Sequence, residues 1–382
     1  MPKNILSGNK GEWSEIYIFF KLLNDRKIYA ADKNMNKLQD VFLNIIRIIR
    51  EEETGKEYSY YTGDNVLIKL NGKKILSVDC KGVNELVNKL WQMISNARGT
   101  FSNAEITEFL NSIYITKLKS PAQKQSCYFG GTQDITVETE DFRSGIRQIM
   151  GFSCKSDLTA ASTLFNASGN NTNFIYKLIG SVDDSFMQKF NSLLDSKGHT
   201  DVFNRIKLLK ENNIDLLFIR PMTYVANQNL VMACGTETPS IVGAMLYFYF
   251  YVNNGKNTYI SDCLPWICAE NPVKYSFDNL NTIYRYRIQT LLYTMFTGLR
   301  FSKPWNCKNE VNGGYIAVKT DGDIVAYHSC IADEFKEFLF EKLRFETPSC
   351  SRHQCMSIEK KDGEYFLKLP LQIRFSLKNK II

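Results

Sequence analysis

The sequence is poor in histidine, and it has neither a dense cysteine framework nor a long apolar run. Only three histidines occur in 382 residues, so a mechanism or zinc site built on several histidines lacks its residues. The ten cysteines are too dispersed for a disulfide-stapled domain and indicate a reducing, cytoplasmic setting. The most apolar run, 241–252, is about half as long as a membrane span, and the first residues lack the apolar core of a signal peptide. We therefore expect a cytoplasmic protein without a membrane partner.

The remaining composition is that of an ordinary globular protein. Hydrophobic residues make up 44% and charged residues 23% of the chain, which excludes disordered, collagen-like and coiled-coil classes. Lys and Arg total 47 against 40 Asp and Glu, giving a formal net charge of +7. This mild excess permits a nucleic-acid partner without requiring one.

Hydrophobic periodicity indicates a mixed α/β chain. Ile16, Phe19, Phe20 and Leu23 follow the helical period and predict an N-terminal helix. Asn71-Gly72 between two apolar runs predicts a β-hairpin. Further helices are expected near 86–94, 106–113, 186–196, 202–211 and 278–300, and further strands near 134–155, 215–219, 314–328 and 358–369.

Two carboxylates lie at the edge of the apolar face of the first helix. Glu12 and Glu15 precede Ile16 and Phe19 by four positions, so extending the stripe backward brings both to its border. A carboxylate beside a buried face is costly unless something compensates for its charge. The compensation could be a bound cation, a buried Lys or Arg, or a helix end that is open to solvent.

Two hairpins have the outline of a metal-dependent nuclease site, with a carboxylate on one strand and a lysine on its partner. In one, Asp134 starts the first strand, and Ser153 and Lys155 share a face of the second strand. Carboxylates hold Mg²⁺, and an adjacent lysine can activate water or stabilise charge. In the other, Asp64 precedes a strand and Asp79-Cys-Lys81 ends the next. Spacing alone does not choose between the two hairpins, and a solvated surface hairpin explains either of them.

Several ordered blocks resemble the HpaII family of type II restriction endonucleases. They extend from the first ten residues to residue 375, so the resemblance covers essentially the whole chain. The blocks are GNKGEWSEIYIFFK (8–21), YAADKNMNK (29–37), DI (134–135), GFSCKS (151–156), STLFNAS (162–168), TNFIYK (172–177), TPSCSRH (347–353) and KLPLQIRF (368–375).

The resemblance implies a restriction-endonuclease-like core of the PD-(D/E)XK type, a mixed central sheet flanked by helices with large helical and β-hairpin additions. It implies Mg²⁺-dependent cleavage of double-stranded DNA at CCGG. Asp134 and Glu15 would bind the metal, Lys155 would be the catalytic lysine, and Ser153 would occupy the position usually held by an acid. Glu12 is the alternative to Glu15. Gln133 stands where a proline is usual, and Ser153 leaves the number of metal ions open.

The resemblance also suggests an organisation for the chain. No Pro/Gly/Ser-rich linker is evident, so we expect a single nuclease unit over 1–382. Within it we expect an N-terminal helix and hairpin region (1–116), a catalytic core (117–260) and a C-terminal helix and hairpin region (261–382). A symmetric DNA site is compatible with a homodimer and also with a monomer.

Candidate DNA contacts are found in three segments. Asn166, Ser168 and Asn173 belong to a polar stretch after the catalytic strand, where loop-forming preference is the simpler explanation. Arg352 and His353 form a second candidate. A basic loop with Lys117, Lys119 and Lys124 could reach phosphates, although solvated lysines are commoner.

Two alternative functions and a zinc site also follow from the residues. Ser153 in place of the acid suggests a sequence-specific DNA-binding protein with a decayed nuclease site. Gly11-x-x-x-Glu15 resembles the helix of junction resolvases and suggests a structure-selective nuclease, although such chains are usually shorter. Cys263-x4-Cys268 and Cys350-x4-Cys355, with His353 in the second pair, are loosely spaced for zinc, and small buried cysteines explain them better.

Overall fold

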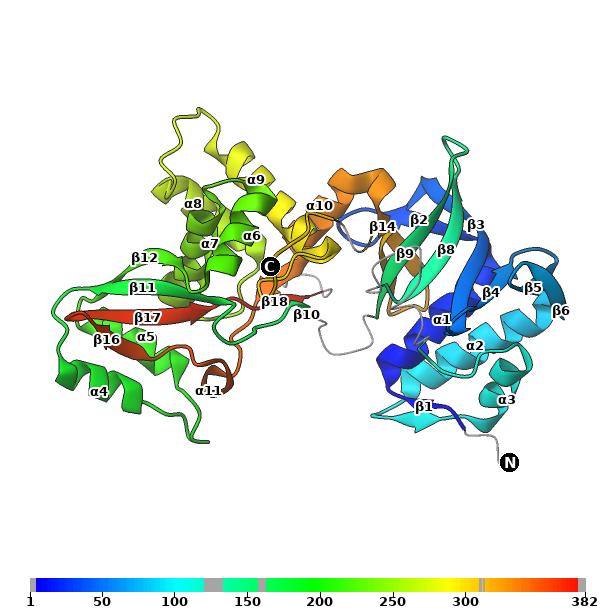
Figure 1. The fold of residues 1–382 in the computed structure, drawn as a ribbon, viewed down its shortest axis with the longest axis horizontal. Helices are drawn as coiled ribbons and strands as arrows, with labels where there is room; N and C mark the ends of the chain where they lie inside the picture. Colours follow the sequence, from blue (N-terminus) through cyan, green and yellow to red (C-terminus); the bar gives the residue numbers. More distant parts are fainter. Residues whose placement is uncertain (1–4, 120–132, 157–162, 309–310, 312, 377–382) are drawn as a thin grey trace. The chain divides into compact units, whose positions relative to one another are not determined.

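The computed structural model describes residues 5–119, 133–156, 163–308, 311 and 313–376. Contacts divide the chain into two compact units, each assembled from separate stretches (Figure 1). Unit 1 comprises 1–160, 309–335 and 378–382, and unit 2 comprises 161–308 and 336–377. These bounds differ from those of the three consecutive sub-regions expected from the sequence.

Unit 1 is built on a nine-stranded sheet with the order β2-β14-β13-β9-β8-β3-β4-β5-β6. β9 pairs antiparallel with β8 and parallel with β13, and β14 pairs parallel with β2, so the sheet is mixed. The predicted mixed α/β class is therefore confirmed. The strands are β2 Lys27–Ala31, β3 Lys37–Glu53, β4 Lys56–Tyr61, β5 Asn65–Leu70, β6 Lys73–Asp79, β8 Ile135–Asp141, β9 Arg147–Ser156, β13 Gly314–Val318 and β14 Ile324–His328.

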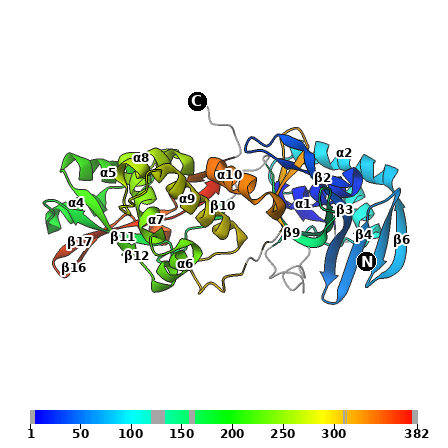
Figure 2. The ribbon, with the colours of Figure 1, turned by 90° about the horizontal axis from the view of Figure 1, so that it is seen from above.

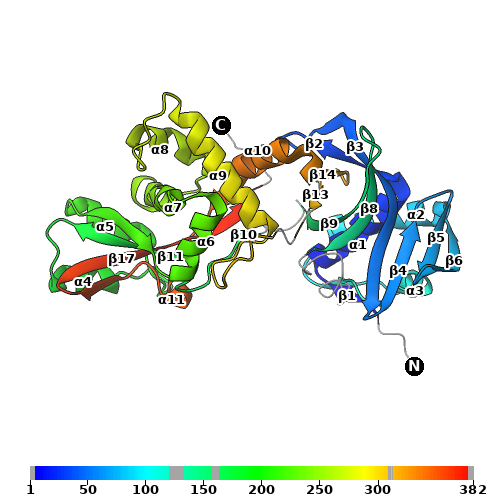
Figure 3. The same ribbon diagram turned by 45° about the horizontal axis from the view of Figure 1, so that its top comes forward.

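Three helices of unit 1 supply one side of its core. The helices are α1 Lys10–Asp25, α2 Cys80–Asn96 and α3 Ala104–Ser112, and the short strands β1 Ser7–Gly8 and β7 Phe101–Ser102 pair beside them. α1 packs against α2, β3 and β9 (Figure 3). Its apolar stripe is buried with Met150, Phe152 and Cys154 of β9. Because side chains alternate along a strand, Ser153 and Lys155 belong to the other set of positions.

Unit 2 combines a four-stranded sheet, β12-β11-β17-β16, with a three-stranded sheet, β10-β18-β15. Helices α6 and α7 contact β12, and α9 contacts α6 and α8; Figure 2 shows these helices gathered together. The strands are β10 Thr163–Phe165, β11 Asn173–Ile179, β12 Asp215–Pro221, β15 Leu343–Phe345, β16 Ile358–Lys361, β17 Glu364–Pro370 and β18 Ile373–Phe375. The helices are α4 Asp184–Ser192, α5 Val202–Glu211, α6 Tyr224–Cys234, α7 Thr238–Tyr247, α8 Leu264–Glu270, α9 Leu280–Thr297 and α11 Cys350–His353.

Shorter helical segments complete the two units. A π-helix covers Phe248–Val252, and 3-10 turns cover Ile260–Cys263 and Ser329–Ile331. Helix α10, Ala332–Lys342, begins in the 309–335 stretch of unit 1 and ends in unit 2. No described helix is both long and apolar enough to cross a membrane.

Local sequence signals explain the hairpins. Asn71 (φ 47°) and Gly72 (φ 83°) both adopt left-handed conformations at the turn between β5 and β6, as an Asn-Gly hairpin turn requires. The predicted hairpin from Asp134 to Lys155 is also confirmed, since β8 and β9 pair antiparallel around the turn at Arg143-Ser144-Gly145. This hairpin brings the two ends of the 134–155 segment side by side.

Candidate active site

Asp134 lies at the open end of the β8–β9 hairpin, opposite the strand that carries Ser153 and Lys155. Its backbone N–H donates to the carbonyl of Phe152 at 2.8 Å, which continues the ladder one residue beyond β8. Its Oδ2 accepts hydrogen bonds from Ser153 Oγ at 3.1 Å and from the Cys154 N–H at 2.7 Å. Lys155 Nζ lies 3.9 Å from the same oxygen. The hairpin thus fixes a carboxylate and a lysine together.

Glu15 of α1 interacts electrostatically with this carboxylate. α1 starts with a capping box, in which Asn9 Oδ1 accepts from the Glu12 N–H at 3.1 Å and Glu12 Oε2 accepts from the Asn9 N–H at 2.9 Å. Glu15 follows one turn later, with its side chain 14% exposed. Burial, and secondly the negative charge of Asp134, raise the pKa of Glu15 to about 7. The two carboxylates therefore share one charged neighbourhood.

Lys119 is the second lysine of this neighbourhood. Its Nζ lies 3.5 Å from Glu15 Oε1, and its side chain is 59% exposed. Partial burial lowers the pKa of the Lys119 ammonium, but the charges of Glu15 and Asp134 outweigh that effect, and the pKa is raised overall. The basic loop of the sequence prediction thus supplies a residue to the carboxylate pair. Lys124 of that loop lies outside the described residues.

The thiol of Cys154 is affected by the same two carboxylates. This residue is buried against α1, and burial, followed by the charges of Asp134 and Glu15, raises the pKa of its thiol. A thiol held in the protonated form is a poor nucleophile and a poor metal ligand. Cys154 therefore packs in the core of unit 1, while its backbone N–H orients Asp134.

The carboxylate pair has the donor chemistry that Mg²⁺ prefers. Asp134 and Glu15 offer hard oxygen ligands from two different elements, and a cation bound between them would offset the burial and the repulsion by Asp134 that raise the pKa of Glu15. In the described part of the chain no three His, Cys, Asp or Glu side chains form a metal-binding group. Two protein ligands still fit Mg²⁺, because that ion commonly retains several waters and binds substrate phosphate. Ser153 donates to Asp134 in this arrangement.

The other candidate carboxylates, Glu12, Asp64 and Asp79, cap helices or form a surface ion pair. Glu12 is engaged by the capping box of α1. In the rival hairpin, Asp79 caps α2, where its Oδ1 accepts from the Lys81 N–H at 2.8 Å, and Lys81 belongs to the helix rather than to a strand. Asp64 is fully exposed and pairs with Arg26 at 3.4 Å. The carboxylate and lysine of this hairpin are therefore not brought together as those of β8 and β9 are.

In unit 2 the structure joins two of the candidate DNA-contact segments. The Gly169 N–H donates to His353 Nδ1 at 3.1 Å, and Asn173 Nδ2 donates to the His353 carbonyl at 3.0 Å. Asn173 is completely buried, so its side chain holds the two segments together. Asn166, Ser168 and Arg352 are exposed. We call residues 166–173, which end at the start of β11, and 350–354, which include the one-turn helix α11, the paired loops.

The cysteine pairs have ordinary surroundings. Cys263 and Cys350 are buried, and Cys355 Sγ contacts the Cys350 carbonyl at 3.9 Å. His353, the imidazole of the second pair, uses Nδ1 to accept from Gly169. These contacts assign packing and loop-joining roles to the second pair.

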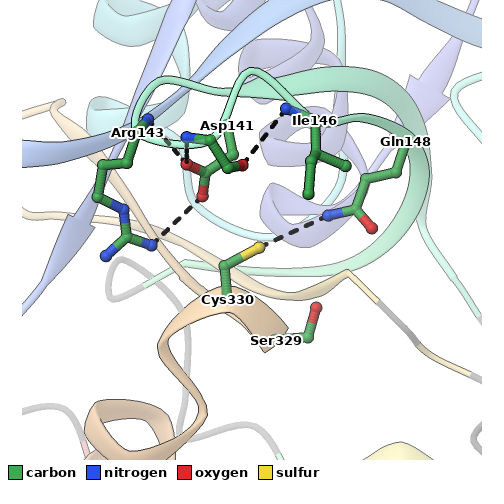
Figure 4. Close-up of a pocket in the computed structure, with 7 residues that line it drawn as sticks. Asp141, Arg143, Ile146, Gln148, Ser329 and Cys330 are labelled. Carbon is green, nitrogen blue, oxygen red and sulfur yellow. Dashed lines mark hydrogen bonds and ion pairs between the residues drawn. The ribbon is translucent and has the colours of Figure 1, made fainter.

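A cavity of about 550 Å³ lies at the turn end of the β8–β9 hairpin (Figure 4). Within it Arg143 Nη2 pairs with Asp141 Oδ2 at 3.3 Å, and Gln148 Nε2 lies 3.5 Å from Cys330 Sγ. The cavity is lined by Asp141, Arg143, Ser144, Ile146, Gln148, Ser329 and Cys330. It contains none of the candidate catalytic residues.

Comparison with known proteins identifies the family. A sequence model of the HpaII restriction endonuclease family matches residues 9–375. The chain is 32% identical over 374 residues to the type II restriction enzyme HpaII of Haemophilus parainfluenzae, an alignment that covers 97% of this chain and 98% of that protein. No solved structure matches the chain. The resemblance seen in the sequence blocks is confirmed: the chain belongs to the HpaII restriction endonuclease family.

Proposed function

We propose that this type II restriction endonuclease hydrolyses phosphodiester bonds in double-stranded DNA at CCGG with Mg²⁺ as cofactor. The observation that carries the proposal is that Lys155 lies beside Asp134 on the hairpin, and that Glu15, from a helix far away in the sequence, interacts electrostatically with both. Type II restriction endonucleases generally need a divalent metal ion, and two carboxylates in one charged neighbourhood supply suitable ligands. The CCGG sequence is carried over from the family resemblance.

In this proposal each residue has a distinct task. Asp134 and Glu15 hold the metal, which when bound supplies positive charge to the phosphate and to the leaving oxygen. Lys155, beside Asp134, orients the attacking water and stabilises the negative charge that develops on the phosphate. Ser153 and the Cys154 N–H fix the Asp134 carboxylate, because both donate to its Oδ2. The carboxylate then needs little reorganisation when substrate arrives.

Unit 1 is proposed to be the restriction-endonuclease-like core. The support for this assignment is the placement of β9 between antiparallel β8 and parallel β13, with α1 packed on that part of the sheet. The functional groups lie at one end of a strand pair whose register is fixed by the hairpin. Unit 2 then represents the large helical and β-hairpin additions.

Unit 2 is proposed to contribute most of the DNA contacts. It contains 22 Lys and Arg against 16 Asp and Glu, whereas unit 1 contains 25 against 24, so nearly all the net positive charge lies in unit 2. Arg352 can donate to guanine O6 and N7, and Asn166 and Ser168 can donate and accept at base edges or phosphates. A palindromic site is suited to a homodimer. We further propose that the enzyme acts on this DNA in the cytoplasm.

Plasmid digestion with sequencing of the cut ends tests the proposal. Purified protein with Mg²⁺ is expected to give discrete fragments whose ends lie within CCGG. Discrete ends at another sequence would refute the CCGG assignment alone, whereas a smear would refute site-specific cleavage.

A second candidate is a CCGG-binding protein whose nuclease site has decayed, and it is favoured by Ser153 at the position of the usual acid. Binding to CCGG duplexes without cleavage in either Mg²⁺ or Mn²⁺ would support this candidate. Cleavage that depends on Asp134 and Lys155 would exclude it, because a decayed site has no such dependence.

A further inference from the structure

The carboxylate pair of the candidate active site is flanked by one lysine on each side. Lys155 Nζ lies 3.9 Å from Asp134 Oδ2, and Lys119 Nζ lies 3.5 Å from Glu15 Oε1. Each carboxyl group thus has one ammonium group beside it before any divalent ion enters. Lys155 belongs to the hairpin, but Lys119 comes from the segment that follows α3.

A buried ion pair anchors the segment that carries Lys119. Arg50 and Glu52, both on β3 and both buried, pair with each other. Arg50 Nη2 donates to the carbonyls of Lys117 and Leu118, the latter at 3.3 Å. Glu52 Oε2 accepts from the backbone N–H of Thr116 at 3.1 Å and from its hydroxyl at 2.7 Å.

These hydrogen bonds fix the position of the residues that precede Lys119. Burying a charged pair is costly unless its hydrogen bonds are satisfied, and here those bonds are made to residues 116–118. Leu118 is buried and packs closely against Gly8. A Cβ added to Gly8 would lie only 2.4 Å from Leu118 Cδ1. Residues 116–118, immediately before Lys119, are therefore held by β3 and by the packing of Leu118 against Gly8.

We propose that Lys119 is a positioning residue that acts as a built-in counter-cation for Glu15 and is exchanged for the divalent cation. In the DNA-free enzyme it holds the Glu15 carboxylate near Asp134 and opposes entry of a metal ion by its positive charge. DNA adds a phosphate and restores negative charge to the site, which favours the exchange. This inference rests on the proposed function, because it requires Glu15 and Asp134 to be the metal ligands.

Mn²⁺ binding to the full-length protein without DNA, followed by electron paramagnetic resonance, tests the inference. Lys119→Gln is expected to bind Mn²⁺ roughly tenfold more tightly than the wild type, because one opposing charge is removed. Lys119→Arg keeps the charge and is expected to retain the weak binding of the wild type. Lys117→Gln is the matched control, since it removes a nearby exposed charge from the same segment and is expected to leave Mn²⁺ binding unchanged. Equal or weaker binding by Lys119→Gln would overturn the inference.

Two ligand variants separate failure of the inference from failure of the proposed function. Glu15→Gln and Asp134→Asn are both expected to lose Mn²⁺ binding, alone and combined with Lys119→Gln. If both bind Mn²⁺ as the wild type does, the proposed metal site is wrong. If both lose binding while Lys119→Gln matches the wild type, only the role of Lys119 is wrong. Thermal melts of each variant establish that it is folded.

Discussion

The two units of the chain use polar side chains in different ways. In unit 1 the candidate active-site residues carry opposite charges, with Lys119 beside Glu15 and Lys155 beside Asp134. Positive and negative residues are nearly equal in number there. In unit 2 the paired loops present uncharged side chains and Arg352 at the surface, joined underneath by the buried amide of Asn173.

This difference corresponds to two separate physical demands. Phosphodiester hydrolysis needs carboxylates held close together despite their repulsion, which requires partial burial and nearby lysines. Sequence reading needs exposed donors and acceptors that reach base edges, with the backbone beneath them held still. We therefore propose that cleavage is a property of unit 1 and that sequence reading is mainly a property of unit 2.

The largest expected effect is the loss of DNA cleavage caused by substitutions in unit 1. Asp134→Asn and Lys155→Met should each lower the rate of DNA cleavage by about 10²–10⁴-fold, because each removes a group that acts on the metal or the water. Both variants should retain CCGG binding in Ca²⁺, measured by gel shift, because the proposed reading surface is untouched. Asp79→Asn is the matched control and should cleave normally. An active Asp134→Asn enzyme together with an inactive Asp79→Asn enzyme would transfer the site to the rival hairpin.

The next effect concerns unit 2. Arg352→Ala should weaken binding to CCGG duplexes by about 1–3 kcal/mol and relax discrimination at one base pair, if this arginine donates to guanine. Lys361→Ala removes one charge from the exposed turn between β16 and β17 and serves as the control. Affinities for CCGG and for single-base variants, measured at fixed salt, give the answer. An equal loss for all sequences would assign Arg352 to a phosphate instead of a base.

The sequence predicts those parts of the site that depend on local order. Asp134, Ser153 and Lys155 belong to one hairpin, so turn chemistry and strand alternation are enough to bring them together. The position of Glu15 at the edge of an apolar stripe also indicates that its charge needs compensation, by a bound cation, by a Lys or Arg, or by a helix end open to solvent. The lysine that lies beside Glu15 is not encoded locally, because Lys119 reaches Glu15 only through the attachment of its segment to β3.

The division into units is likewise not a local property. β13 and β14 return to the sheet of unit 1 from residues 314–328, after the long intervening stretch that belongs to unit 2. No linker composition marks these crossings. The pairing of the loops at 166–173 and 350–354 has the same origin, since Asn173 and His353 are 180 residues apart.

The smallest predicted effect is a pH-dependent change in stability that follows from the burial of Glu15 in unit 1. The folded protein keeps the proton of Glu15 to about pH 7, whereas the ordinary pKa is 4.5. The favourable contribution of protonated Glu15 is therefore complete below pH 4.5 and is lost as pH rises through 7. Without divalent ions, Glu15→Gln should be more stable than the wild type at pH 8. The stability gap should exceed that at pH 5.5 by about 1–2 kcal/mol.

Denaturant unfolding of both proteins at the two pH values measures this gap. Added Mg²⁺ should narrow it at pH 8, because a cation bound between Glu15 and Asp134 stabilises the ionised carboxylate of the wild type and has one ligand fewer in Glu15→Gln. A gap that is the same at both pH values would contradict the burial of an ionisable Glu15. If the gap grows with pH but does not change when Mg²⁺ is added, Glu15 is buried but is not a metal ligand. Asp134 would then hold the ion without it.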